Sequence, residues 1–120
     1  MQEATPPEIQ DGTLSIRIVE EDSVRTLALA GELDLANSAS LAARLEEPVA
    51  GELVLDMSEL EFIDSTGIAL LVATHRRLNG SGTVGFRLIG SDSLAVRRVM
   101  ALTGLDAELP WGEAGEMPQA

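Results

Sequence analysis

The chain contains no cysteine, no lysine and no tyrosine, and aromatic residues make up only 2% of its 120 residues. Without cysteine, neither a disulfide framework nor a thiolate metal site is available. The scarcity of aromatic side chains excludes the base-stacking platforms of single-strand nucleic-acid-binding proteins. No apolar run approaches the roughly 20 residues that cross a bilayer. The sequence therefore predicts a domain built on aliphatic packing, without a membrane-spanning helix.

Positive charge is also scarce, because eight basic residues stand against 20 acidic residues and give a formal net charge of −12. Nucleic acids and anionic membranes require a basic footprint, so we expect neither as a partner. A strong acidic balance favours solubility and a basic protein partner. The N-terminal residues lack a basic segment followed by an apolar run, which predicts no secretory signal and a cytoplasmic location. The only histidine, His75, has no partner suited to a metal, so we expect no metal site and no cofactor.

One domain is expected at this length, and the chain is long enough for a single hydrophobic core. Residues 1–12 contain two prolines, three acids and a single large apolar residue besides Met1, and we interpret them as a flexible leader. Residues 112–120 contain glycine, proline and acids, and we interpret them as a flexible tail. The predicted domain is therefore 13–111.

Four segments have the alternation or the short apolar run that is typical of strands: 14–18, 24–30, 53–55 and 84–88. Three segments have helical spacing: 38–47, a helix that follows a turn at 64–67 and ends near 79, and a helix that begins after Ser91 or Asp92 and ends at Gly104. Residues 107–111 are a candidate for a last short strand. The first two strands predict an antiparallel hairpin, and the later alternation of strands and helices predicts parallel pairing. The expected fold is an α/β fold, a mixed sheet with helices packed on it.

The most informative run is LEFIDSTGIALL at residues 60–71, which predicts a buried strand, a tight polar turn and a helix that opens on hydroxyl side chains. Unpaired N–H groups and the positive end of the helix dipole favour a phosphate at such a position. Ser65 is therefore a candidate switch, nucleophile or simple N-cap. An aspartic-protease interpretation of Asp64 is disfavoured, because Thr66 separates the serine from the glycine and a helix follows.

Four segments together resemble the STAS domain of bacterial anti-sigma-factor antagonists: GELDLA at 31–36, LVLDMS at 53–58, FIDSTGI at 62–68 and RRVMALTGL at 97–105. The resemblance spans about residues 14–110 and implies a STAS-like mixed sheet. In that family an anti-sigma factor, itself an ATP-dependent serine kinase, phosphorylates the serine of this turn. The unphosphorylated antagonist binds the anti-sigma factor and frees the sigma factor, and a phosphatase restores the active form. Family members commonly carry a longer C-terminal helix, whereas the tail after Trp111 in this sequence is short.

Carried over by position, the resemblance implies that Ser65 is the phosphoacceptor, with Asp64 beside it and Asp34 on a neighbouring loop of the same partner-binding patch. Thr66 is expected to be structural, and Gly67 to allow a partner backbone to approach closely. The resemblance implies a non-enzymatic switch whose partners are a serine-kinase anti-sigma factor and a serine phosphatase. The alternative is a STAS scaffold or a lipid-transport accessory subunit, in which the same turn docks a partner without a phosphorylation cycle.

Overall fold

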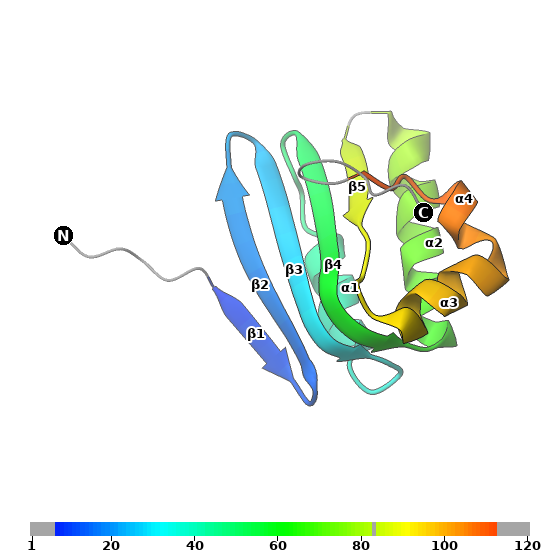
Figure 1. The fold of residues 1–120 in the computed structure, drawn as a ribbon. Coiled ribbons are helices and arrows are strands. Elements are labelled where there is room, and N and C mark those ends of the chain that lie inside the picture. The colour runs from blue at the N-terminus through cyan, green and yellow to red at the C-terminus, as the bar shows by residue number, and fades with distance from the viewer. Residues whose placement is uncertain (1–6, 83, 113–120) are drawn as a thin grey trace.

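The computed structural model describes residues 7–82 and 84–112. Within them, five strands form one sheet in the order β1-β2-β3-β4-β5, and helices pack on it (Figure 1). The strands are β1 (Glu8–Asp11), β2 (Leu14–Glu21), β3 (Val24–Leu33), β4 (Glu52–Ile63) and β5 (Gly85–Ile89). The helices are α1 (Ser38–Leu45), α2 (Ser65–Ser81), α3 (Leu94–Thr103) and α4 (Leu105–Glu108). The predicted α/β fold is confirmed.

The sheet changes from antiparallel to parallel pairing at β3. β1 pairs with β2 and β2 with β3 in the antiparallel sense, whereas the β3–β4 and β4–β5 pairs are parallel. A parallel pair requires a crossover connection, and α1 and α2 supply the two crossovers. The hairpin followed by parallel strands is therefore as predicted, and the carboxyl ends of β3 and β4 lie at the same edge of the sheet.

The core is aliphatic, as the scarcity of aromatic residues requires. Leu27, Leu55 and Leu88 occupy neighbouring positions on β3, β4 and β5, and none of them has solvent-exposed area. They belong to the same cluster as Leu41 of α1 and Leu71 of α2. Burial of apolar surface stabilises a fold by about 25 cal/mol per Å², so this cluster holds the helices on the sheet.

The N-terminal part departs from the expected organisation at β1. Residues 8–11 form an edge strand, where we expected part of a flexible leader. Ile9 lies opposite Ile16 of β2, and the Pro7 carbonyl accepts a further backbone hydrogen bond from β2. A single apolar residue produces no period-two signal in the sequence, although it is sufficient to pair a short strand with a free edge. The rest of the expected leader, 1–6, lies outside the described residues.

The prediction of a last strand at 107–111 is wrong. The chain instead forms α4, and only Trp111 pairs with the sheet, as an isolated bridge to Leu88 of β5. The Trp111 indole Nε1 donates a 2.9 Å hydrogen bond to the carbonyl of the first residue of α4. The tryptophan therefore secures the short helix rather than extending the sheet. Most of the expected tail, 113–120, lies outside the described residues.

β4 has 12 residues, although the sequence predicts only a short strand at 53–55 and a buried strand directly before the turn at 64–67. Two register shifts interrupt its pairing with β3, one between Ala28 and Ala30 and one between Gly31 and Glu32. At each shift β4 carries an extra residue, as in a β-bulge, which bends the strand and increases its twist. An extra residue also moves every later side chain to the opposite face of the sheet. The bulges therefore hide the alternation that would have predicted a long strand.

Helix ends agree with the sequence to within a few residues, but the N-cap of α3 differs. Gly104 has φ 78° and is the left-handed C-cap of α3, as predicted. The N-cap is Ser93, whereas Ser91 and Asp92 were the candidates. The Ser91 hydroxyl is buried and donates to the Leu60 carbonyl at 2.6 Å. A buried hydroxyl requires such a partner, so Ser91 ties the start of α3 to β4 instead of capping the helix.

Gly31 provides a test of the backbone geometry at the end of β3. Its φ is +95°, and a Cβ at this position would overlap the backbone carbonyl of Thr13. We expect Gly31→Ala to lower the free energy of unfolding by at least about 2 kcal/mol, because both the strained φ and the overlap must be relieved. Gly80→Ala is the matched control, since Gly80 lies in α2 with open space around its Cβ position. Alanine there should raise stability by about 0.5–1 kcal/mol. Denaturant titration measures both effects, and a Gly31→Ala variant as stable as the parent would contradict this account.

Candidate functional site

The carboxyl ends of β3 and β4 bring the predicted site residues to one edge of the sheet (Figure 1). The loop 34–37 follows β3, and α2 follows β4 at the same edge. The Asp64 N–H donates to the Leu33 carbonyl at 3.1 Å, so the two segments are joined as they leave the sheet. The Ser93 hydroxyl donates to the Glu61 carbonyl at 3.1 Å and brings in the start of α3. We call the resulting surface the α2 edge and define it as residues 34–37, 61–67 and 91–94.

The Asp64 side chain is the N-cap of α2 and connects two parts of the α2 edge. Its Oδ1 accepts hydrogen bonds from the N–H groups of Thr66 at 2.9 Å and Gly67 at 3.1 Å. Its Oδ2 accepts a third, at 3.1 Å, from the Leu35 N–H on the loop after β3. The carboxylate therefore satisfies the first turn of the helix and fixes the neighbouring loop at the same time.

Ser65 is the first residue of α2 and is exposed. The N-cap interpretation of Ser65 is wrong, because Asp64 has that position. The expectation of unpaired N–H groups is corrected for three residues, since the N–H groups of Thr66 and Gly67 donate to the Asp64 carboxylate and that of Ile68 to the Asp64 carbonyl. Within residues 7–82 and 84–112, no hydrogen bond holds the Ser65 hydroxyl. The hydroxyl is thus available to an external reactant.

Asp34 organises the loop that lies beside Ser65. Its Oδ1 accepts from the Ala36 N–H at 3.0 Å, and its N–H donates to the Asn37 Oδ1 at 2.9 Å. Asn37 is buried and also donates from its side chain to the Glu32 carbonyl at 3.0 Å. These bonds are typical of a turn-stabilising aspartate. The structure places Asp34 on the same edge as Asp64, as expected, and shows that it shapes the loop.

Gly67 is buried, and its neighbours explain why the position is a glycine. A Cβ there would lie 2.7 Å from Ile63 Cγ1 and 2.9 Å from Leu33 Cγ. The absence of a side chain therefore lets α2 begin close to the ends of β3 and β4. The sequence analysis explained the glycine by the close approach of a partner backbone. The structure explains it by the packing of α2 within the domain. Thr66 is half-buried and contributes its N–H to the capped first turn.

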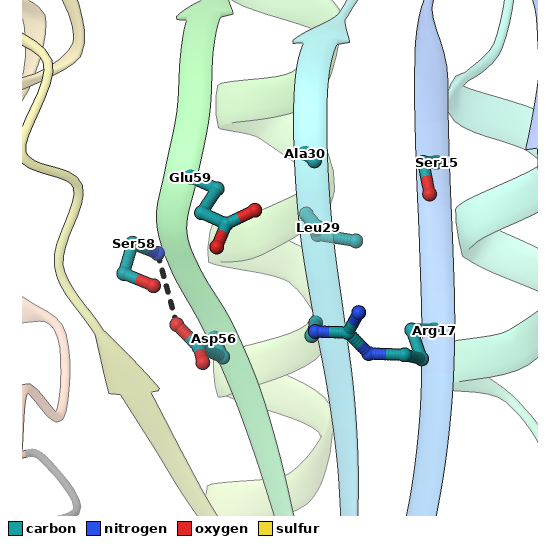
Figure 2. A pocket seen from close by; sticks show the side chains of 8 residues that line it. Ser15, Arg17, Leu29, Ala30, Asp56, Ser58 and Glu59 are labelled. Atoms are coloured by element: carbon teal, nitrogen blue, oxygen red, sulfur yellow. Dashed lines mark hydrogen bonds between the residues drawn. The ribbon is translucent and has the colours of Figure 1, made fainter. Parts of the chain in front are cut away.

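A second polar feature, a small hollow, lies on the sheet face opposite the helices (Figure 2). Ala28 and Ala30 of β3 line it with small side chains, and Arg17 extends over β3 from one side (Figure 2). Asp56 lines the other side and accepts a hydrogen bond from the Ser58 N–H at 2.9 Å. The first bulge of β4 lies directly before Glu59, and it turns this second acidic side chain toward the same face. The hollow is separate from the α2 edge, and the sequence contained no signal for it.

Three large apolar side chains at the α2 edge were also missed by sequence reasoning. Leu35, Phe62 and Leu94 are exposed although each lies in or next to a predicted strand, helix or motif. Apolar residues within an apolar run are normally read as core, so only their place beside the polar turn could have indicated a surface role.

The part of the chain that the structure describes has neither a metal-binding cluster nor a membrane-spanning helix. No three histidine, cysteine or acidic side chains gather there as a potential metal site. No helix of that part is long and apolar enough to cross a bilayer.

Comparison with known proteins agrees with these features. The family model of the STAS domain matches residues 15–114. The chain is 33% identical over 97 residues to the anti-sigma-F factor antagonist RsfB of Mycobacterium tuberculosis strain H37Rv, a match that covers 78% of this chain and 77% of the relative. An anti-sigma factor antagonist from Mycobacterium paratuberculosis has a similar structure, with a TM-score of 0.71, 27% identity and coverage of 88% of this chain and 86% of that chain.

A more distant structure shows the fold alone. It is the Bacillus cell fate determinant SpoIIAA in its phosphorylated form, with a TM-score of 0.60, 20% identity and coverage of 82% of this chain and 92% of that chain. The resemblance seen in the sequence and the predicted STAS-like sheet are both confirmed. By its family match, its relatives and its fold, the chain belongs to the STAS domain family.

Proposed function

We propose that this chain is an anti-sigma factor antagonist whose activity is switched by phosphorylation of Ser65. The unphosphorylated form binds a serine-kinase anti-sigma factor in the cytoplasm and releases the sigma factor, and the phosphorylated form does not bind. The chain itself catalyses no reaction and requires no cofactor. The domain at 13–111, extended by β1, carries this function. The observation that carries the proposal is the exposed Ser65 hydroxyl, which no described residue binds, at the start of α2.

Asp64 supports the role of Ser65 as a phosphoacceptor. A serine that caps a helix keeps its hydroxyl engaged with the backbone, whereas Asp64 takes over the cap and frees the hydroxyl. A relative that is 33% identical, RsfB, is an anti-sigma-F factor antagonist. SpoIIAA shares the fold and has a phosphorylated form, so a STAS fold is compatible with a phosphate.

In the proposed cycle, Ser65 Oγ attacks the γ-phosphorus of ATP held by the partner. ADP leaves, and the hydroxyl proton passes to a base of the kinase. The phosphatase later hydrolyses the phosphoester with water, which returns the hydroxyl and releases inorganic phosphate. The antagonist supplies a positioned hydroxyl and a docking surface, and both enzymes act on it.

Phosphorylation is expected to change the surface more than the fold. A phosphate adds about −1.5 to −2 charge, directly beside the Asp64 carboxylate. The helix dipole favours this charge, but the N–H groups of Thr66 and Gly67 already donate to Asp64. The phosphate therefore projects toward the partner, where its bulk and the cost of its desolvation oppose docking. A loss of about 3 kcal/mol corresponds to roughly a hundredfold in affinity.

Substitutions at Ser65 test the switch. Ser65→Ala should bind the anti-sigma factor, accept no phosphate and remain constitutively active. Ser65→Asp should fold normally and bind about ten- to a hundredfold more weakly, because one carboxylate mimics part of a phosphate. Thr66→Ala is the control and should still be phosphorylated. Phosphopeptide mapping after incubation with the kinase and ATP decides the assignment, which fails if the phosphate is found elsewhere or if Ser65→Ala is labelled as fully as the parent.

Substitutions at Asp64 test its role as a cap. Asp64→Ala removes an acceptor from three N–H groups and should lower the free energy of unfolding by about 1–2 kcal/mol. Asp64→Asn retains a good capping side chain and should lose less. Asp92→Ala, at an exposed position of the same edge, should stay within about 0.5 kcal/mol of the parent. Denaturant titration provides the comparison. If Asp64→Ala is as stable as the parent, the Asp64 cap does not contribute to the stability of the fold.

The net charge of −12 predicts electrostatic steering toward a basic partner surface. The association rate constant should therefore fall as ionic strength rises, while the dissociation rate constant changes less. Stopped-flow or surface-based kinetics with the anti-sigma factor at several salt concentrations measures both. An association rate constant that is the same at low and high salt would refute steering.

A further inference from the structure

Exposed large apolar side chains are concentrated at the α2 edge. Among the described residues, five large apolar side chains are exposed: Val19, Leu35, Phe62, Leu94 and Leu102. Three of these lie at the α2 edge, where Leu35 is 75% exposed, Leu94 66% and Phe62 43%. Single exposed apolar residues are ordinary, but a group of them on one small surface indicates an interaction site.

Backbone contacts place the three side chains around the end of β4. Leu35 follows β3, and its N–H binds the Asp64 carboxylate. Phe62 lies two residues before Asp64 on β4 itself. Leu94 begins α3 directly after Ser93, whose hydroxyl binds the Glu61 carbonyl. Because β4 lies between β3 and β5 in the sheet, the loop after β3 and the segment that leads from β5 into α3 flank the end of β4 (Figure 1).

The backbone under these side chains is held in place. The loop that carries Leu35 is fixed by the hydrogen bonds of Asp34 and by the Asp64 carboxylate. The segment before Leu94 is fixed to β4 by the Ser91 hydroxyl and by the N–H of Asp92, which donates to a β4 carbonyl. Because this backbone is already fixed, binding does not have to order it, and pre-organisation of this kind favours high affinity.

Acidic residues surround the three apolar side chains. Glu32, Glu61 and Asp92 are exposed, and Asp34 and Asp64 are half-buried at the same edge. Residues 31–36, 59–68 and 90–95 contain no basic residue. A complementary surface would therefore have an apolar centre with arginine or lysine around it, which is a common arrangement of a binding centre and its rim.

We propose that Leu35, Phe62 and Leu94 are the energetic centre of the interface with the anti-sigma factor, and that they seat in an apolar pocket bordered by basic residues. This inference rests on the proposed function and names side chains outside the polar turn as the source of affinity. A few buried apolar residues commonly supply most of the binding energy of an interface. They would also place the Ser65 hydroxyl in the kinase site, so their loss should reduce phosphorylation as well as binding.

The test uses the full chain and its kinase, which is isolated with the parent chain as bait and identified by transfer of phosphate from ATP to Ser65. Leu35→Ala, Phe62→Ala and Leu94→Ala should each raise Kd by about tenfold or more, mainly through faster dissociation. The loss should be nearly independent of salt, because no charge changes. Leu102→Ala is the matched control. Leu102 is 80% exposed on the same helix as Leu94 but about 12 Å further along it. The Kd of Leu102→Ala should stay within about twofold of the Kd of the parent.

Stability is measured in parallel by thermal unfolding. Phe62 is the least exposed of the three, so Leu35→Arg and Leu94→Arg decide the outcome if Phe62→Ala unfolds. Arginine at these positions suits the acidic surroundings of the free protein and opposes a basic-rimmed pocket, so both variants should fold and bind at least tenfold more weakly.

The outcomes separate the inference from the function on which it rests. If the parent binds and is phosphorylated at Ser65 while the Leu35 and Leu94 variants bind within about twofold of it, the apolar centre is refuted and the switch stands. If arginine at Leu35 or Leu94 strengthens binding, the partner surface is acidic or polar, and the inference is again refuted. If no protein captured by the parent phosphorylates Ser65, the proposed function fails and the inference fails with it.

Discussion

The Asp64 carboxylate is the group on which the α2 edge depends. One of its oxygens caps the first turn of α2, and the other binds the N–H of Leu35 on a loop that is distant in sequence. A charged acceptor makes stronger hydrogen bonds to N–H groups than a neutral one and is favoured at the positive end of a helix. Because Asp64 does the capping, the hydroxyl of Ser65 stays exposed. One side chain thus sets both the shape of the edge and the chemistry that it offers.

Packing below the edge sets its position as strictly as the hydrogen bonds do. Gly67 allows α2 to start against Ile63 and Leu33, where a methyl group would already be too close. The bulges of β4 bend the strand before it reaches this edge and decide which of its side chains face outward. The position of the exposed Ser65 hydroxyl therefore depends on the aliphatic core, and a substitution in that core would shift it.

Charge and apolar surface have different roles at the α2 edge. Acidic side chains act over distances of the order of a Debye length, about 8 Å at physiological salt, and mainly influence how quickly partners meet. Apolar side chains act only on contact and mainly influence how long partners stay together. A phosphate on Ser65 would add a dianion to this edge, next to the Asp64 carboxylate, which already accepts from the N–H groups of Thr66 and Gly67.

The sequence by itself determined the order of strands and helices from β2 to α3, the parallel pairing after the hairpin, the family and the placing of Ser65 at a helix start. These depend on short-range periodicity, turn residues and chain order, which are local properties. It did not determine β1, the length of β4 or the choice of Asp64 over Ser65 as the cap. Aspartate and serine cap helices about equally well, and here the contact of Asp64 with Leu35 favours the aspartate. The exposure of Leu35, Phe62 and Leu94 was likewise decided only by tertiary structure, because the burial of an apolar side chain depends on neighbours that are distant in sequence and on bulges that no pattern reveals.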